Sequence, residues 1–197
     1  MKKTLLFTLL LMTLSVNLFS QEKTDSDSKR MKPALIVMDI QNAYLPMMDE
    51  ADQKMGPVMI NYMIDLFRTG GYPIITIYHQ DLNQGPEPGT EGFKFPDTIK
   101  ILTTDPVVIK HRASGFKETD LDKILKEKGI NTLFITGLSA VGCALATYIE
   151  AGDLGYNTFF VKYSLLSHDH DYTKKIEEMF GAVNYDVVRT MLDNAVK

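Results

Sequence analysis

Five short apolar runs alternate with longer amphipathic stretches through most of this chain, and no other feature limits its fold as strongly. The runs are rich in β-branched or aromatic residues, which suits strands buried on both faces of a sheet. They span residues 34–38, 74–78, 107–109, 133–136 and 158–161. Ala182 and Val183 are a candidate sixth strand. Regular alternation of strand and helix predicts a three-layer α/β fold on a mostly parallel sheet.

Apolar residues at helical spacing predict five helices between and after these strands. The predicted helices span residues 54–67, 120–128, 141–154, 172–180 and 186–196. Thr119 and Asp171 are the residues that we expect to cap helix N-termini. Four glycines stand where helix C-terminal glycines belong, at Gly70, Gly129, Gly155 and Gly181.

The segment 80–97 interrupts this alternation. It holds three prolines and three glycines, so we predict a long ordered loop between the second and third strands. Long loops of this kind often cover a functional site. We therefore expect this loop to set the choice of substrate.

The first 20 residues have the layout of a secretory signal peptide. Two lysines precede an apolar run over residues 5–14, and the small residue Ser20 precedes a polar stretch. The apolar run is too short for a membrane-spanning helix. We therefore expect a signal peptide at 1–20, a flexible leader at 21–32 and one folded domain at 33–197. The mature protein would be exported and would have no membrane span.

The charge balance bears on the kind of partner. The chain carries 21 Lys and Arg residues against 25 Asp and Glu residues, for a formal net charge of −4 at pH 7. No basic run is longer than Lys29-Arg30, whereas a nucleic-acid partner needs a concentrated positive face. We therefore expect a small-molecule substrate and no nucleic-acid partner.

Cys143 is the only cysteine of the chain, so it cannot form an intramolecular disulfide, the usual role of cysteine in exported proteins. It could be a buried apolar filler, because free cysteine is among the most buried residue types. It also follows the fourth predicted strand at the start of a helix, which suits a nucleophile. Composition alone leaves both interpretations open.

Three residues suited to nucleophilic catalysis fall at the carboxyl ends of predicted strands. Asp39 ends the first strand, Lys110 ends the third, and Cys143 follows the fourth. In a parallel α/β sheet, ligands bind at this edge. Taken singly, Asp39 could cap a turn, Lys110 could be a solvated charge, and Cys143 could pack in the core. Their meeting at one edge favours a common site.

The position of Cys143 predicts a reactive thiol. A helix N-terminus carries partial positive charge and unpaired N–H groups, and both favour a thiolate over a thiol. A nearby ammonium from Lys110 would act in the same direction. Asp39 could take the thiol proton and later deliver it to a leaving amine.

The segment before the cysteine offers a suitable backbone. Gly137 and Gly142 permit a tight turn, so that the amides of Ser139 and Cys143 could converge on a developing oxyanion. If the strand order is 3-2-1-4-5-6, however, the third strand lies two spacings, about 9–10 Å, from the first. Lys110 must then lean inward to reach Asp39.

Three segments, 34–44, 70–80 and 107–167, resemble the isochorismatase-like cysteine hydrolase superfamily. They carry the Asp, Lys and Cys elements in order, together with a Gly-x-x-x-x-x-Cys turn. The resemblance implies a doubly wound α/β/α sandwich with a six-stranded sheet. It also implies homodimers or tetramers, which are common among relatives.

The same resemblance implies roles for single residues. The catalytic triad falls on Asp39, Lys110 and Cys143, and a cis peptide bond is expected between Leu138 and the oxyanion-hole residue Ser139. Two aromatic residues, Tyr44 and Phe116, would lie at the substrate pocket, with core packing as the alternative.

Two histidine-containing segments raise the question of a metal. Nicotinamidases of the superfamily bind a metal through an Asp-x-His motif and a further His. This chain has His79 and Asp81 but no second histidine in the loop, so we expect no metal and no other cofactor. The cluster at 168–171 could bind a cation, but it precedes a helix, which favours solvated capping.

These observations predict an exported hydrolase that cleaves an amide or related C–N bond of a small molecule through an acyl-enzyme on Cys143. One alternative is vinyl-ether hydrolysis of the isochorismate type, in which Asp39 is essential and the cysteine is dispensable. A second alternative is a binding protein that kept the fold and lost the chemistry.

Overall fold

The computed structural model describes residues 30–195. The predicted signal peptide and all but the last three residues of the predicted leader lie outside the described residues. The compact unit that carries the sheet begins at Lys32, whose backbone N–H donates to Asn131 Oδ1 at 2.8 Å. Within residues 30–195, no helix is both long enough and apolar enough to cross a bilayer.

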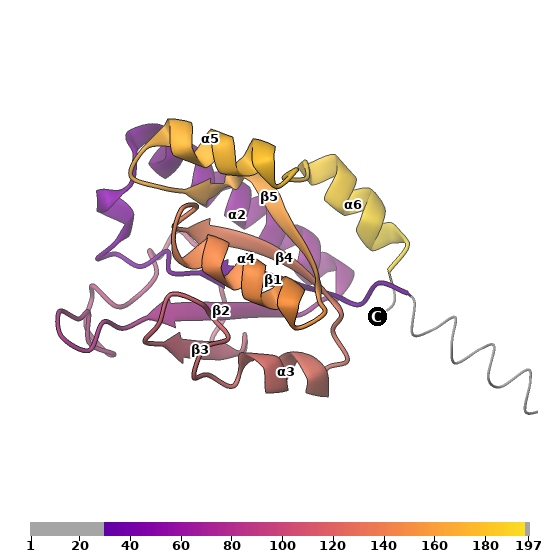
Figure 1. Cartoon of the computed structure of the whole chain (residues 1–197), viewed down its shortest axis with the longest axis horizontal. Coiled ribbons are helices and arrows are strands. Elements are labelled where there is room, and N and C mark those ends of the chain that lie inside the picture. The colour runs from indigo at the N-terminus through magenta and orange to yellow at the C-terminus, as the bar shows by residue number, and fades with distance from the viewer. Residues whose placement is uncertain (1–29, 196–197) are drawn as a thin grey trace, which may run out of the picture. The chain divides into compact units, whose positions relative to one another are not determined.

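The centre of this unit is a parallel sheet, as predicted (Figure 1). Its strands are β1 (Pro33–Met38), β2 (Ile74–His79), β3 (Val107–Lys110), β4 (Thr132–Leu138) and β5 (Asn157–Leu166). Their order is β3-β2-β1-β4-β5. Neighbouring strands pair in parallel throughout. The carboxyl ends of β1, β3 and β4 therefore lie along one edge.

Within residues 30–195, the sheet has five strands instead of the predicted six. Val183 makes only an isolated parallel bridge to Val161. Gly181 turns the chain out of one helix with φ 60, and the next helix already begins at Tyr185. The segment left between the two helices is too short to form a ladder.

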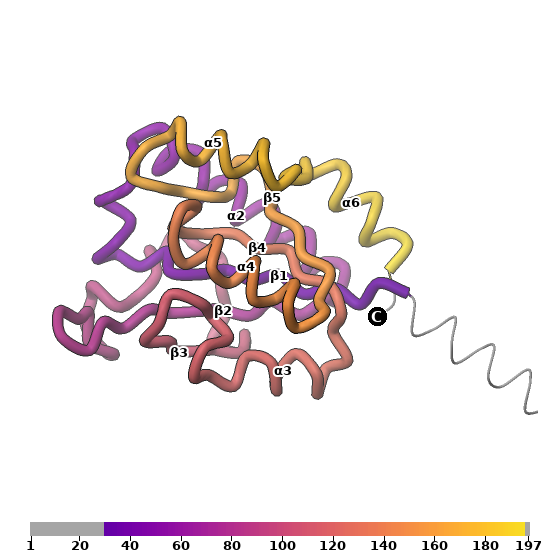
Figure 2. Tube along the Cα trace, viewed as in Figure 1, coloured from indigo at the N-terminus to yellow at the C-terminus, as the bar shows by residue number. Residues whose placement is uncertain are grey.

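Helices cover both faces of the sheet. They are α2 (Glu50–Gly70), α3 (Leu121–Glu127), α4 (Cys143–Asp153), α5 (His170–Met179) and α6 (Tyr185–Asp193), with a short 3-10 turn η1 (Leu45–Met47). Figures 1 and 2 show α4 in front of the sheet and α2 behind it. Successive residues of β4 point to opposite faces of the sheet. Phe134 packs against Phe67 of α2, whereas Ile135 belongs to the core cluster that contains Ala144 of α4.

Two predicted helix ends need correction. The helix predicted at 54–67 begins at Glu50, because Asp49 caps it by accepting a hydrogen bond from Ala51 N–H at 2.8 Å. Its left-handed C-terminal glycine is Gly71 (φ 74) instead of Gly70. The other three predicted glycines, at 129, 155 and 181, do have positive φ.

The long loop at 80–97 is ordered by contacts with neighbouring segments. Phe93 and Phe95 stack on Tyr78 of β2, with ring centroids 5.1 and 4.2 Å away. The backbone N–H of Asn42 donates to Lys94 O at 2.8 Å. The loop is thereby held against the segment that follows β1, at the edge where the candidate catalytic residues lie.

Gly137 is required where β4 passes β1. Its φ is 108, and a Cβ at this position would lie 2.0 Å from the carbonyl oxygen of Met38. The residue therefore allows the two strands to approach closely just before Asp39 and Ser139.

We expect Gly137→Ala to lower the free energy of unfolding by about 3 kcal/mol or more, since steric overlap and an unfavourable φ act together. Gly152→Ala in α4 is the matched control, because nothing lies within 4 Å of its added Cβ. The control should be neutral or stabilising by up to about 1 kcal/mol. Urea unfolding of the three proteins measures both effects, and equal stability of the two variants would contradict this account of Gly137.

Candidate active site

Asp39 and Lys110 meet at the carboxyl edge of the sheet. Lys110 Nζ lies 2.9 Å from Asp39 Oδ2, and both side chains are almost completely buried. Asp39 follows β1 with φ 55, and Lys110 is the last residue of β3. The two strand spacings between them are crossed by the long lysine side chain, so Lys110 leans inward as the site requires.

His79 at the end of β2 supports the lysine between these two strands. Its backbone is paired with Lys110 in the sheet register, and Lys110 Nζ lies 3.2 Å from His79 Nδ1. Burial, followed by the charge of Lys110, lowers the pKa of His79 to about 4. The ring is therefore neutral at pH 7, and its Nδ1 accepts from the ammonium. Lys110 Nζ also donates a hydrogen bond to Arg112 O at 3.2 Å.

Asp39 is a buried carboxylate whose oxygens can still accept a hydrogen bond or a proton. Burial raises its pKa to about 6, and the charge of Lys110 is the largest opposing influence. Within residues 30–195, neither of its oxygens meets the geometric criteria for a hydrogen bond, and its close contact is the ion pair with Lys110. At pH 7 the carboxylate is mostly ionised and able to accept a proton.

Cys143 is the first residue of α4 and is partly buried. Burial, followed by the charge of Asp39, raises its pKa to about 11, although Lys110 acts in the opposite direction. The expectation that the surroundings of Cys143 favour the thiolate was therefore wrong, because they raise the thiol pKa. Desolvation and the nearby carboxylate outweigh the ammonium, so the resting state pairs a neutral thiol with an ionised acid.

The turn before Cys143 leaves two backbone donors unpaired. Ser139 O accepts hydrogen bonds from Gly142 N–H at 2.9 Å and from Ala144 N–H at 3.1 Å. Within the described part of the chain, the N–H groups of Ser139 and Cys143 donate to no backbone carbonyl. Both predicted oxyanion-hole donors are thus available to a substrate oxygen.

Two other expectations about this turn can be compared with the structure. The peptide bond between Leu138 and Ser139 is cis, as the resemblance implied. Gly142 has φ −136, and a Cβ there would make only ordinary contacts with Ser139. Of the two glycines expected to permit the turn, only Gly137 has a positive φ.

Tyr44 lies beside this site. Its hydroxyl donates to Gly85 O at 3.1 Å, and its ring centroid is 5.9 Å from that of His79. Burial raises the pKa of Tyr44 to about 12, with Asp39 the next largest cause. Tyr44 and His79 line a cavity of about 280 Å³ together with residues of the loop at 80–97. A role for Tyr44 in substrate binding stays a prediction, and this cavity supports it.

Phe116 lies in the hydrophobic core. Its exposed fraction is 7%, and its ring stacks on Tyr156 with centroids 5.8 Å apart. It also belongs to the main cluster of buried apolar residues. The packing alternative accounts for these contacts.

Gln41 is a site residue that we did not predict. Its fully buried side chain accepts a hydrogen bond from His79 N–H at 2.7 Å and donates to His79 O at 3.1 Å. These two hydrogen bonds hold the end of β2 against the segment after β1. They thereby help to align Lys110 with Asp39. A polar residue two positions after Asp39, just beyond the apolar run at 34–38, was the available signal.

The histidine-containing segments have other partners. Among residues 30–195, no group of three or more His, Cys, Asp or Glu residues is placed to hold a metal. In the cluster at 168–171, Asp169 caps α5 by accepting from Asp171 N–H at 2.8 Å, and His170 Nδ1 lies 2.5 Å from Asp52 Oδ1. Capping is therefore confirmed, with Asp169 instead of Asp171 as the cap. At α3 the predicted cap Thr119 accepts from Leu121 N–H at 3.3 Å.

Comparison with known proteins agrees with this architecture. The sequence profile of the Isochorismatase domain matches residues 33–189. The isochorismatase family protein YddQ of Bacillus subtilis is 30% identical over 133 residues, covering 64% of this chain and 73% of YddQ. Ureidoacrylate amidohydrolase RutB of Pseudomonas savastanoi pv. phaseolicola is 27% identical over 168 residues, covering 64% and 69% of the respective chains.

A solved structure has a similar fold. N-carbamoylsarcosine amidase from Thermoplasma acidophilum superposes with a TM-score of 0.64 at 29% identity, covering 78% of this chain and 95% of the amidase. Since the domain profile spans most of the chain, the protein belongs to the isochorismatase family of hydrolases.

Proposed function

We propose that this protein hydrolyses an amide or related C–N bond of a small molecule through Cys143, Asp39 and Lys110. The observation that carries the proposal is the buried contact of 2.9 Å between Lys110 Nζ and Asp39 Oδ2, at the edge where Cys143 begins α4. Two similar proteins are by name an amidohydrolase and an amidase, which supports C–N bonds as the target.

In the acylation step, Asp39 takes the proton from the thiol as Cys143 Sγ attacks the substrate carbonyl carbon. The carbonyl oxygen becomes an oxyanion that accepts from the N–H groups of Ser139 and Cys143. As the tetrahedral intermediate collapses, the C–N bond breaks and Asp39 gives its proton to the leaving nitrogen. The products of this step are a free amine or ammonia and a thioester on Cys143.

In the deacylation step, a water molecule attacks the thioester carbonyl and Asp39 accepts the water proton. The C–S bond then breaks, the acid product leaves, and the proton on Asp39 returns to the Cys143 sulfur. Lys110 keeps the carboxylate in place through both steps. The hydrogen bonds of Lys110 to His79 and Arg112 keep its ammonium group beside Asp39.

A second candidate is the vinyl-ether hydrolysis of the isochorismate type, with Asp39 as a general acid. The raised pKa of about 6 favours it, because a carboxyl group with that pKa holds its proton in mildly acidic solution. In this reaction the thiol has no covalent role.

A substrate panel separates the two reactions. Small amides, ureides and carbamoyl amines are assayed by ammonia release, and isochorismate by loss of its vinyl ether. For an amidase, Asp39→Asn and Cys143→Ala should each lose ammonia release, because the first removes the base and the second the nucleophile. Loss of isochorismate cleavage in Asp39→Asn alone would contradict the amidase and support the second candidate.

Export and self-association are part of the same proposal. The signal-peptide pattern at 1–20 supports export, and N-terminal sequencing of the protein secreted by an expressing host would test it. Homo-oligomers are expected from the family resemblance. Analytical ultracentrifugation would test this, and a monomer at high concentration would contradict it.

A further inference from the structure

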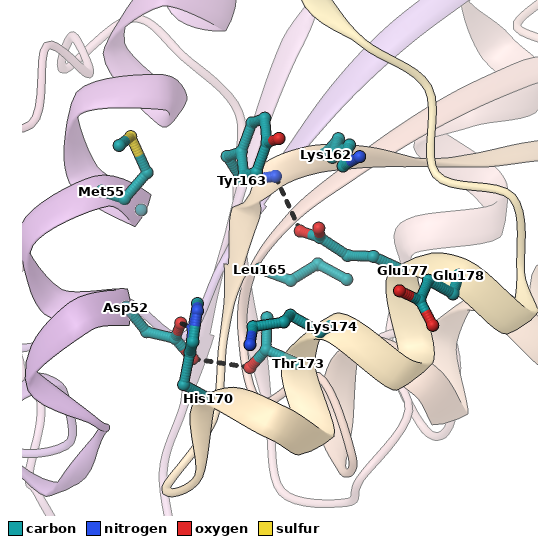
Figure 3. A pocket seen from close by; sticks show the side chains of 11 residues that line it. Asp52, Met55, Lys162, Tyr163, Leu165, His170, Thr173, Lys174, Glu177 and Glu178 are labelled. Atoms are coloured by element: carbon teal, nitrogen blue, oxygen red, sulfur yellow. Dashed lines mark hydrogen bonds and ion pairs between the residues drawn. The ribbon is translucent and has the colours of Figure 1, made fainter.

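A second cavity lies away from Asp39 and Cys143, between α2, β5 and α5 (Figure 3). Its volume is about 290 Å³. Met55 of α2 and Leu165 and Tyr163 of β5 provide apolar walls, and the polar groups come mainly from α5. A mostly apolar cavity of this size with a few converging polar groups has the composition of a small-molecule site.

Glu177 is one of two buried acidic residues that line this cavity. Its exposed fraction is 6%, and its Oε1 accepts a hydrogen bond from Tyr163 N–H at 2.7 Å. Tyr163 adopts φ 67, a left-handed conformation that is rare for tyrosine. Within residues 30–195, no basic group forms an ion pair with Glu177. The chain thus holds a carboxylate in the wall without supplying its counter-charge.

The two lysines that line the cavity are engaged elsewhere. Lys162 Nζ lies over the ring of Tyr163, 5.1 Å from its centroid. Lys174 Nζ pairs with Asp171 Oδ1 at 3.1 Å. Neither ammonium group therefore neutralises Glu177 at close range.

Asp52, the other buried carboxylate of the cavity, has several hydrogen-bond donors around it. It accepts hydrogen bonds from Ser167 N–H, from Thr173 Oγ1 and from His170 Nδ1 at 3.0, 2.6 and 2.5 Å. Its partners are all within the fold, so it has a structural explanation. In the described part of the chain, Glu177 accepts only one hydrogen bond, from Tyr163 N–H.

The surroundings of Glu177 disfavour its charged form. Its pKa is raised to about 7, chiefly by burial and to a smaller extent by Asp52, while Tyr163, Lys162 and His170 act in the opposite direction. A buried carboxylate without a close cation is costly, and a cation within contact distance would relieve that cost.

We propose that this cavity binds a small organic cation with an apolar body, whose charged group pairs with Glu177 and whose body packs on Met55, Leu165 and Tyr163. The site is independent of the hydrolase proposed above. Its test therefore needs no measurement of turnover.

The test uses three probes with the same ring and different charge: benzylamine, benzyl alcohol and benzoate. The full chain is labelled with ¹⁵N and titrated at pH 8, above the pKa of Glu177. The amide resonance of Tyr163 reports on the cavity because its N–H donates to Glu177. Saturable shifts should give a dissociation constant at least about tenfold lower for benzylamine than for benzyl alcohol, and benzoate should not saturate.

Two variants locate the effect. Glu177→Gln keeps an oxygen that can accept from Tyr163 N–H and removes the charge, so the dissociation constant of benzylamine should rise at least about tenfold. Glu127→Gln in α3 removes an exposed charge that does not line the cavity and should change this dissociation constant less than about twofold. Thermal unfolding confirms that both variants fold, and if Glu177→Gln does not, the three-probe series on the unmodified chain decides.

Three results would each overturn the proposal. Benzyl alcohol or benzoate could bind as tightly as benzylamine, benzylamine could produce no saturable shift of the Tyr163 resonance, or a folded Glu177→Gln could bind benzylamine unchanged.

Discussion

Replacement of Cys143 by alanine is expected to lower kcat by about 10⁴-fold or more, because the variant has no atom that can form the thioester. The affinity for substrate should change little, since the backbone N–H groups of Ser139 and Cys143 do not depend on the side chain. Steady-state ammonia release and substrate binding by calorimetry measure these two quantities.

The fold should survive this change. Cys143 is only partly buried, so truncation to alanine should cost about 1 kcal/mol of stability. Because the chain has a single cysteine, any thiol label on the unmodified protein reports on this position alone. Full turnover by a folded Cys143→Ala variant would refute the covalent route.

Replacement of Lys110 by methionine is expected to remove activity and stability together. The change leaves Asp39 buried without its cation, and breaking a buried ion pair costs about 3–5 kcal/mol. At pH 7 Asp39 would hold its proton, so kcat/KM should fall by about 10²–10⁴-fold through loss of the base. Urea unfolding and ammonia release check the two effects.

The pH dependence identifies the cause. Asp39 must be ionised to accept the thiol proton, so in the unmodified protein kcat/KM should rise as pH rises through about 6. Lys110 opposes the increase that burial causes in this pKa. Its removal should therefore move the rise in activity to higher pH.

Lys126→Met is the matched control. Lys126 pairs with Asp122 at 2.6 Å, but its side chain is 65% exposed, and exposed pairs contribute at most about 1 kcal/mol. This variant should keep the activity and pH profile of the unmodified chain. An unchanged acidic limb in Lys110→Met would contradict the assigned pairing with Asp39.

The arrangement of the site followed from the sequence because it depends on strand ends. The apolar runs located the strands, and Asp39, Lys110 and Cys143 each stand at or after a run. A parallel sheet brings such ends to one edge. Strand order and the inward lean of Lys110 could not be read from the sequence, since both depend on contacts between segments distant along the chain.

The properties of the thiol were harder to predict than its position. The sequence places Cys143 at a helix start near a lysine, which favours a thiolate. The structure adds desolvation and the proximity of Asp39, and these two effects reverse the direction of the pKa shift. Gln41 escaped prediction for a similar reason, because its role depends on where the backbone of His79 lies.

During turnover, Cys143 is expected to carry the acyl group of the substrate. Rapid quenching of the unmodified chain and of Cys143→Ala during turnover of an identified amide, followed by peptide mass spectrometry, tests it directly. We expect the peptide that contains Cys143 to carry the mass of the acyl group, and the alanine variant to give neither an adduct nor the acid product. Acylation of Cys143 would be contradicted if both proteins formed product and the Cys143 peptide of the unmodified chain carried no adduct.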